Sequence, residues 1–80
     1  MGMQTDAEKE ATMKAIGARM KEARERQGLN HNQVGRLLGI SGQRVSEWEE
    51  GTSAKLYFLD PLANILKVNF AWLVAGKGRP

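Results

Sequence analysis

Apolar residues recur at intervals of three and four along most of this chain, the spacing that places them on one face of a helix. The first run has four such positions, Met13, Ile16, Met20 and Ala23. Thr5 and Glu8 have the spacing of a capping box, so we predict that a helix starts near Thr5 and stops at Gly28. No stretch alternates apolar with polar residues as a half-buried strand would.

Two short helices joined by a very tight turn are predicted next. Asn30 can cap the first of them, and Gly39 can end it in a left-handed conformation. Ser41 can cap the second. The inward-facing residues are predicted to be Val34, Leu37 and Leu38 in the first helix, and Val45 and Trp48 in the second. So short a connection sends the second helix off at ~90–120° to the first, which is a helix-turn-helix arrangement.

The remainder of the chain predicts two more helices. Residues 52–57 are expected to form a loop, after which Asp60 caps a fourth helix and Pro61 occupies its first turn. A fifth helix is predicted to start at Asn69 and to end at Gly76, with Phe70, Leu73 and Trp72 as candidates for its packed residues. The predicted fold class is all-α, a compact bundle of five short helices. We divide the chain into an N-terminal arm with the start of the first helix (1–12), a helix-turn-helix domain (13–76) and a C-terminal tail (77–80).

Length and composition narrow the class of protein. A chain of 80 residues has room for one domain, and without cysteine it has neither disulfides nor thiolate metal ligands. No apolar stretch approaches the ~20 residues of a membrane span, so we expect a cytoplasmic, nucleoid-associated protein without membrane contact. Lys and Arg outnumber Asp and Glu by 12 to 9, a mild excess that is compatible with a polyanionic partner.

Catalytic and cofactor chemistry is not expected. The single histidine, His31, belongs to a different predicted helix from Ser41 and Ser46 and has no evident carboxylate to orient it, so no nucleophile and base are paired. The glycines match neither a P-loop nor a dinucleotide-binding pattern. We therefore expect no enzyme activity, cofactor, metal or small-molecule substrate.

The second helix of the tight pair carries the candidate base-reading residues. In a helix-turn-helix this helix projects its N-terminal, outward side chains into the DNA major groove. With Val45 and Trp48 turned inward, the outward residues are predicted to be Gly42, Gln43, Arg44, Ser46 and Glu47. A glutamine can pair with adenine, an arginine with guanine or a phosphate, and a glutamate with the amine of cytosine.

Contacts to the phosphate backbone are expected from helix starts and from nearby cationic or hydroxyl side chains. The candidates are Asn30, His31, Asn32, Arg36, Ser41, Lys55 and Tyr57. Such contacts fix the position of a protein on DNA without selecting a sequence.

Several separate blocks of this sequence form a pattern at defined spacing: Ile16-Gly17-x-Arg19-Met20-x-x-Ala23-Arg24, Gly28-Leu29-Asn30, Leu38-Gly39-Ile40-Ser41, Val45-Ser46-x-Trp48-Glu49-x-Gly51, Leu62-Ala63-x-x-Leu66 and Trp72-Leu73-x-x-Gly76. These blocks resemble the lambda-repressor-like, Cro-type helix-turn-helix family of phages and bacteria. The resemblance covers roughly residues 16–78 and is similar to short lambdoid phage repressor domains. It implies an ion pair between Arg24 and Glu49, and dimer contacts around the last helix, with Asn69, Phe70 and Trp72.

The leading hypothesis is a transcriptional regulator, a repressor of phage or bacterial origin, that binds a near-palindromic double-stranded DNA operator as a homodimer. The sequence departs from the family pattern where members often carry glutamine and this chain has His31 and Gly42. Two alternatives stay open: a protein-interaction module that has lost DNA affinity, or an antitoxin that binds both its own promoter and a toxin.

Overall fold

Five helices form the regular secondary structure of residues 5–80, the part of the chain that the computed structural model describes. They are α1 (Asp6–Arg26), α2 (His31–Leu38), α3 (Gly42–Glu49), α4 (Leu56–Leu66) and α5 (Phe70–Ala75). The described part of the chain contains no strand, and the predicted all-α bundle is confirmed. Residues 1–4 of the expected N-terminal arm lie outside the described residues. None of these helices is long and apolar enough to cross a bilayer.

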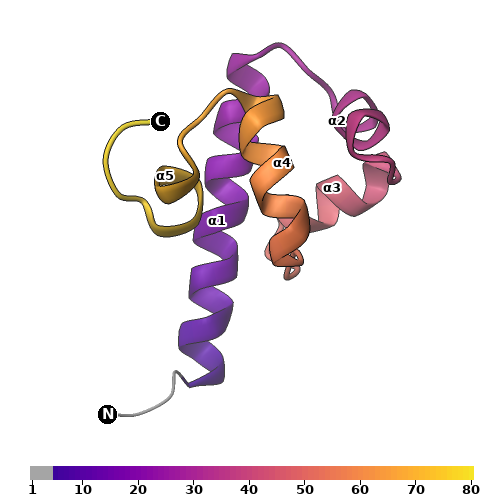
Figure 1. The fold of residues 1–80 in the computed structure, drawn as a ribbon. Helices are drawn as coiled ribbons and strands as arrows, with labels where there is room; N and C mark the ends of the chain where they lie inside the picture. The colour runs from indigo at the N-terminus through magenta and orange to yellow at the C-terminus, as the bar shows by residue number, and fades with distance from the viewer. Residues whose placement is uncertain (1–4) are drawn as a thin grey trace.

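The longest helix, α1, organises the bundle. Its first turns extend beyond the other helices, as Figure 1 shows. The capping box is present: Thr5 Oγ1 accepts from the Glu8 backbone, and the Thr5 backbone donates to Glu8 Oε1 at 2.8 Å. Hydrogen bonding by the Thr5 backbone, and to a lesser extent by the Thr5 side chain, lowers the pKa of the Glu8 carboxyl group, because it favours the charged form. The predicted start of the first helix is therefore confirmed.

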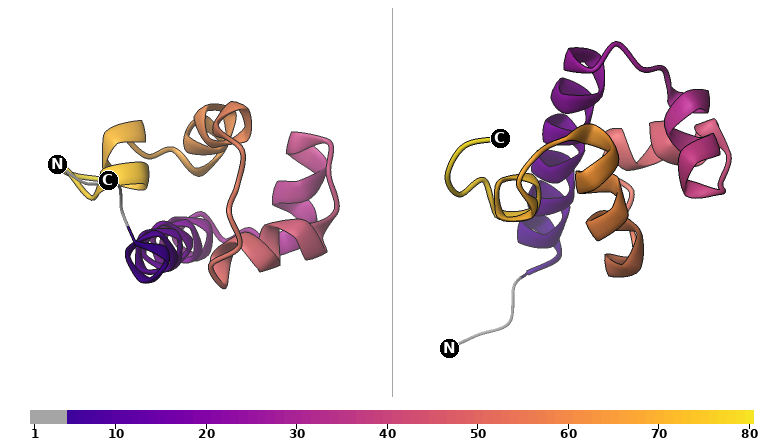
Figure 2. Two further views of the ribbon diagram at one scale, coloured as in Figure 1. Left: turned by 90° about the horizontal axis from the view of Figure 1, so that it is seen from below. Right: turned by 45° about the horizontal axis from the view of Figure 1, so that its top comes forward.

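The other helices lie on two sides of α1. The α2–α3 pair lies on one side, where α3 packs on α1. On the other side, α5 packs against both α1 and α4 (Figures 1 and 2). A hydrogen bond between residues far apart in the sequence joins α1 to α5, since Arg19 Nε donates to the Leu73 carbonyl at 2.8 Å. The pair that carries the candidate site thus rests on a frame built by α1, α4 and α5.

A single apolar cluster fills the space between the helices. Its buried members are Ile16, Met20, Ala23, Val34, Val45, Trp48, Leu59, Leu62, Ala63, Leu66, Trp72 and Leu73. The inward positions predicted for α3 are confirmed, but the prediction for α2 is wrong at Leu37, which is 64% exposed. Leu37 and Leu38 point in directions about 100° apart around the helix, and it is Leu38 that packs against the core.

The predicted start of the fourth helix is wrong. Its start is Leu56, not Asp60, so Pro61 lies inside α4 rather than in its first turn. The N-cap is Lys55, whose side chain makes no capping hydrogen bond. Burial of Leu59, which is 7% exposed, stabilises the extra turn and outweighs the local signal of Asp60 and Pro61.

Candidate nucleic-acid interface

The turn between α2 and α3 is fixed by backbone geometry. Gly39 has φ = +78°, a left-handed conformation that favours glycine, and so ends α2 as predicted. The Ile40 N–H donates to the Gly35 carbonyl at 2.9 Å and closes the turn. A side chain at Gly35 would meet the Ile40 carbonyl oxygen at 2.7 Å, so α2 lies directly against the turn that follows it. The start of α3 is therefore held at a fixed place beside α2.

Both helices of the pair have capped N-termini. Asn30 Oδ1 accepts from the Gln33 N–H at 2.8 Å, and Gln33 Oε1 accepts from the Asn30 N–H at 2.8 Å, a full capping box. Ser41 Oγ accepts from the Arg44 N–H at 3.2 Å. These bonds confirm Asn30 and Ser41 as caps, and they leave the amide NH₂ of Asn30 for an outside acceptor.

An open hollow of about 340 Å³ lies between the two helix starts. It brings together residues predicted for phosphate contact and residues predicted for base reading: Asn30, His31, Asn32, Gly42, Gln43 and Ser46. Because the positive ends of two helix dipoles flank this hollow, it favours a negatively charged group.

The prediction that Gly42 faces outward is wrong. Gly42 is buried, and a side chain at this position would collide with Asn32 Oδ1 and lie 2.8 Å from the Asn32 backbone nitrogen. Glycine here lets the start of α2 lie against the start of α3. A residue without a side chain at a closed contact cannot read a base, so Gly42 has a packing role.

Three side chains form the exposed ridge of α3: Gln43, Arg44 and Glu47. Ser46 is half-buried and lines the hollow instead. The ridge lies opposite the buried Val45 and Trp48, which anchor α3 in the core. The helix therefore presents polar groups to solvent along its first two turns while its other face stays fixed.

The C-terminal end of α3 is held by a buried ion pair. Glu49 accepts from Arg24 Nε at 2.6 Å and from Arg24 Nη2 at 3.1 Å, and its side chain is only 5% exposed. The hydrogen bond to Glu49 raises the pKa of Arg24, so the guanidinium keeps its charge. The ion pair implied by the family resemblance is thus present, and it ties α1 to α3.

Glu49 also contacts the half-buried His31, whose Nε2 lies 2.9 Å from Glu49 Oε1. The expectation that no carboxylate orients His31 is therefore wrong. The two residues stand 18 positions apart on different helices, so no local spacing in the sequence signals the contact. With Nε2 held by Glu49, Nδ1 is the ring nitrogen of His31 that has no hydrogen-bond partner among residues 5–80.

A small aromatic cluster lies beside the ridge. The guanidinium carbon of Arg44 lies 5.4 Å from the ring centroid of Phe58, on α4. Phe58 in turn lies 5.3 Å from the Trp48 ring and 4.9 Å from the Tyr57 ring, measured between centroids. Sequence reasoning missed Phe58, because the residue stands outside the helix-turn-helix pair.

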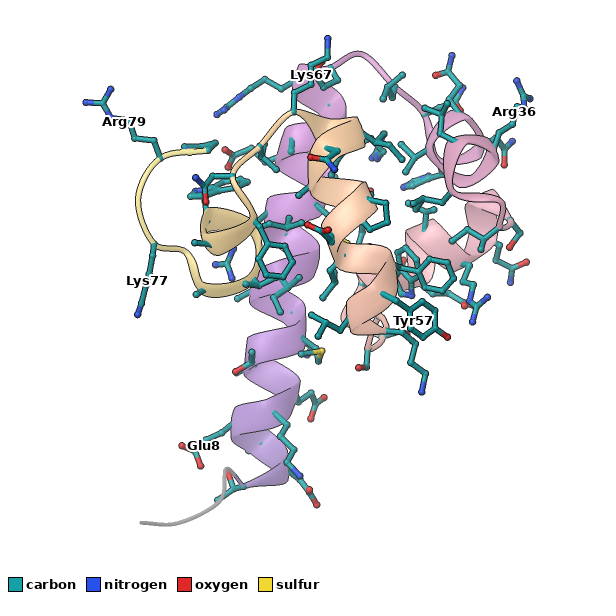
Figure 3. The ribbon with its side chains drawn as sticks, in the orientation of Figure 1. Glu8, Arg36, Tyr57, Lys67, Lys77 and Arg79 are labelled. Atoms are coloured by element: carbon teal, nitrogen blue, oxygen red, sulfur yellow. The ribbon has the colours of Figure 1, made fainter. Side chains whose placement is uncertain are left out.

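The remaining phosphate candidates border this surface. Arg36, Lys55 and Tyr57 are exposed, Tyr57 to 70%. In Figure 3, Arg36 projects from α2 and Tyr57 lies at the start of α4, with α3 between them in that view. These cationic and hydroxyl groups are thus open to solvent.

The residues predicted for dimer contact are elsewhere, on α5. Asn69 caps α5 through its side chain, and Phe70 is half-buried. Trp72 is only 9% exposed and belongs to the core of the monomer, so its assignment to a dimer surface is wrong. Its indole has little surface left for a partner.

A family model described as helix-turn-helix matches residues 20–73, which includes α2, α3 and the packing helix α4. The chain belongs to the helix-turn-helix family. The resemblance drawn from the separate sequence blocks is confirmed, and the family segment contains the ridge and the hollow.

Relatives of this helix-turn-helix chain include two curated transcriptional regulators, those for the conjugative elements SXT of Vibrio cholerae and pMERPH of Shewanella putrefaciens. Each is 32% identical over 66 residues. The match covers 82% of this chain and 31% of each relative, so the chain spans less than a third of their length.

Among solved structures, the P22 c2 repressor in complex with synthetic operator 9T in the presence of Tl⁺ has the same fold. The TM-score is 0.72 with 24% identity, and the likeness covers 78% of this chain and 96% of that one. At this identity the match concerns the fold of the helix-turn-helix domain.

Proposed function

We propose that this chain binds double-stranded DNA in a sequence-specific manner and regulates transcription as a repressor, with α3 in the major groove. The similar regulators of conjugative elements and the likeness to a repressor solved with an operator support this class of function. A protein with this function works on the chromosome or a mobile element in the cytoplasm.

The observation that carries the proposal is the exposed polar ridge of α3 beside a hollow between two helix starts. In this proposal Gln43 pairs with adenine, Arg44 with guanine and Glu47 with the exocyclic amine of cytosine. Ser46 contributes only where a base edge or phosphate enters the hollow. Each paired contact discriminates by about 1–3 kcal/mol.

Phosphate contacts then hold the ridge in register. The hollow receives one phosphate, bound by Asn30, by Asn32 and by the backbone start of α2, with Nδ1 of His31 beside it. The capped start of α3 at Ser41 contributes a further contact. On the flanks, Arg36, Lys55 and the hydroxyl of Tyr57 bind neighbouring phosphates and make the affinity dependent on salt.

One such domain has a small contact surface, so we propose that two copies bind a near-palindromic operator. Their α3 helices then lie ~34–36 Å apart, one turn of DNA. The α5 surface around Asn69 and Phe70 stays our proposal for the contact between copies.

Selection of bound sequences from a random DNA pool tests the proposed function, followed by titration of the selected DNA at several salt concentrations. We expect a consensus with two-fold symmetry and an affinity that falls as salt rises. Replacing Lys55 by alanine should weaken binding to all sequences and reduce the salt slope by about 1. Failure to enrich any sequence, together with no retention of DNA at low salt, would contradict the proposal.

A further inference from the structure

Phe58 lies in the structure where it can act on Arg44 without belonging to the reading helix. Its ring is half-buried at the start of α4, and the guanidinium carbon of Arg44 lies 5.4 Å from the ring centroid. No other cation lies over an aromatic ring among residues 5–80. The contact joins a base-reading candidate to a helix that has no place in the tight pair.

The Phe58 ring is the main partner of the Arg44 guanidinium among residues 5–80. No carboxylate within residues 5–80 lies at ion-pair distance from Arg44. Its backbone is fixed, because its N–H donates to Ser41 Oγ. An arginine within about 6 Å of a ring centroid is attracted to the negative face of the ring. The backbone of Arg44 is therefore held by the cap of α3, and its guanidinium is held by the ring.

The ring that restrains Arg44 is itself held in place. Phe58 packs against the ring of Trp48, which is 3% exposed and anchored in the core, and Tyr57 lies against it as well. A fixed aromatic face limits the positions that the guanidinium samples before DNA arrives. Since an arginine side chain otherwise loses considerable rotational freedom on binding, such restraint strengthens a contact.

We propose that Phe58 is a positioning residue that sets base preference through Arg44. The inference rests on the proposed DNA-binding function and deepens it. Phe58 itself touches no base. Its ring holds the guanidinium over the edge of the ridge, so that the preference at the base pair facing Arg44 depends on an aromatic side chain at position 58.

A double-mutant cycle tests this positioning. The four proteins are the unaltered chain, Phe58→Leu, Arg44→Ala and the double variant, each titrated against the selected operator and operators altered at one base pair. Leucine keeps an apolar side chain but has no aromatic face. We expect Phe58→Leu to reduce the preference at a single base pair by about 2- to 5-fold. In the Arg44→Ala background the same substitution should change no preference.

Two controls separate positioning from a general effect on the fold. Ile65→Val changes another half-buried apolar side chain of α4 and should leave relative affinities for the operators unchanged. Phe58→Tyr keeps the aromatic face and should retain the preference. A uniform loss for all operators, or an equal effect of Phe58→Leu with and without Arg44, would overturn the inference.

A measurement on the unaltered protein covers the case in which Phe58→Leu does not fold. The ring current of Phe58 should shift the Arg44 δ protons upfield in the NMR spectrum, both in the free protein and in the operator complex. Loss of that shift in the complex would overturn the inference while leaving DNA binding intact. Absence of any DNA binding is a different result, since it would contradict the proposed function as well.

Discussion

The two ends of α3 are built in opposite ways. At the C-terminal end, Trp48 is buried in the core and the Glu49 carboxylate is enclosed by Arg24 and His31. At the N-terminal end, Gln43 is exposed and no hydrogen bond within residues 5–80 involves its side chain. Buried polar groups must find partners inside the protein, whereas exposed ones stay available to a ligand. One helix thus has a fixed end and a reading end.

The fixed end gives the largest predicted effect. Replacing Glu49 by alanine leaves Arg24 buried without its carboxylate, which should lower the free energy of unfolding by about 3–5 kcal/mol. Urea unfolding measures this loss. Glu47→Ala, on the exposed ridge of the same helix, is the matched control and should change stability by less than about 0.5 kcal/mol. Similar values for the two variants would contradict the distinction between the ends.

The contact between α1 and α3 gives the next effect. A Cβ at Gly17 would collide with the Trp48 carbonyl oxygen and lie 2.6 Å from that of Glu49. Gly17→Ala should therefore destabilise the fold by about 1–3 kcal/mol, although alanine favours a helix more than glycine does. Ala15→Gly, at an exposed site on the same helix, measures the helix propensity alone. Stabilisation by Gly17→Ala would show that the contact is not as close as described.

A substitution at the reading end of α3 should change the free energy of unfolding by a smaller amount. Ser41→Ala removes the hydrogen bond to the Arg44 N–H, a loss of about 1 kcal/mol by thermal or urea unfolding. Ser53→Ala changes an exposed loop serine and is the control. If the two serine variants were equally stable, Ser41 would not cap α3.

The smallest predicted effect is a pH dependence at the start of α1. The pKa of Glu8 is lowered in the folded protein, so its contribution to stability is present above the usual pKa of 4.5 and is lost as pH falls through the lowered value. An NMR titration of the Glu8 carboxyl group checks this. Thr5→Ala removes one of the hydrogen bonds and should move the midpoint upward. A midpoint that Thr5→Ala leaves unchanged would show that the Thr5 side chain does not contribute to the shift.

Local signals in the sequence sufficed for much of the fold. The caps at Thr5, Asn30 and Ser41 and the glycine stop at Gly39 depend on neighbours within a few residues, and each is present. The start predicted for α4 from Pro61 was wrong, because this local helix-start signal competed with the burial of Leu59, which is a tertiary effect. Local patterns therefore predict helix ends well only where packing agrees with them.

The candidate site was only partly predictable for the same reason. The exposed ridge residues followed from helical spacing around Val45 and Trp48. The burial of Gly42 did not follow from this spacing, because the contact that encloses Gly42 comes from Asn32 on another helix. The contact of Arg44 with Phe58 joins different helices and has no signature in spacing. Roles that depend on contact between helices required the structure.

Competition binding with Gln43→Ala measures base reading by α3, with operators altered at one base pair in each half-site and Glu50→Ala as a control at the other end of the helix. We expect Gln43→Ala to lose about 1–3 kcal/mol of discrimination at one base pair while its melting temperature stays that of the unaltered protein. Unchanged relative affinities for all operators would contradict this expectation.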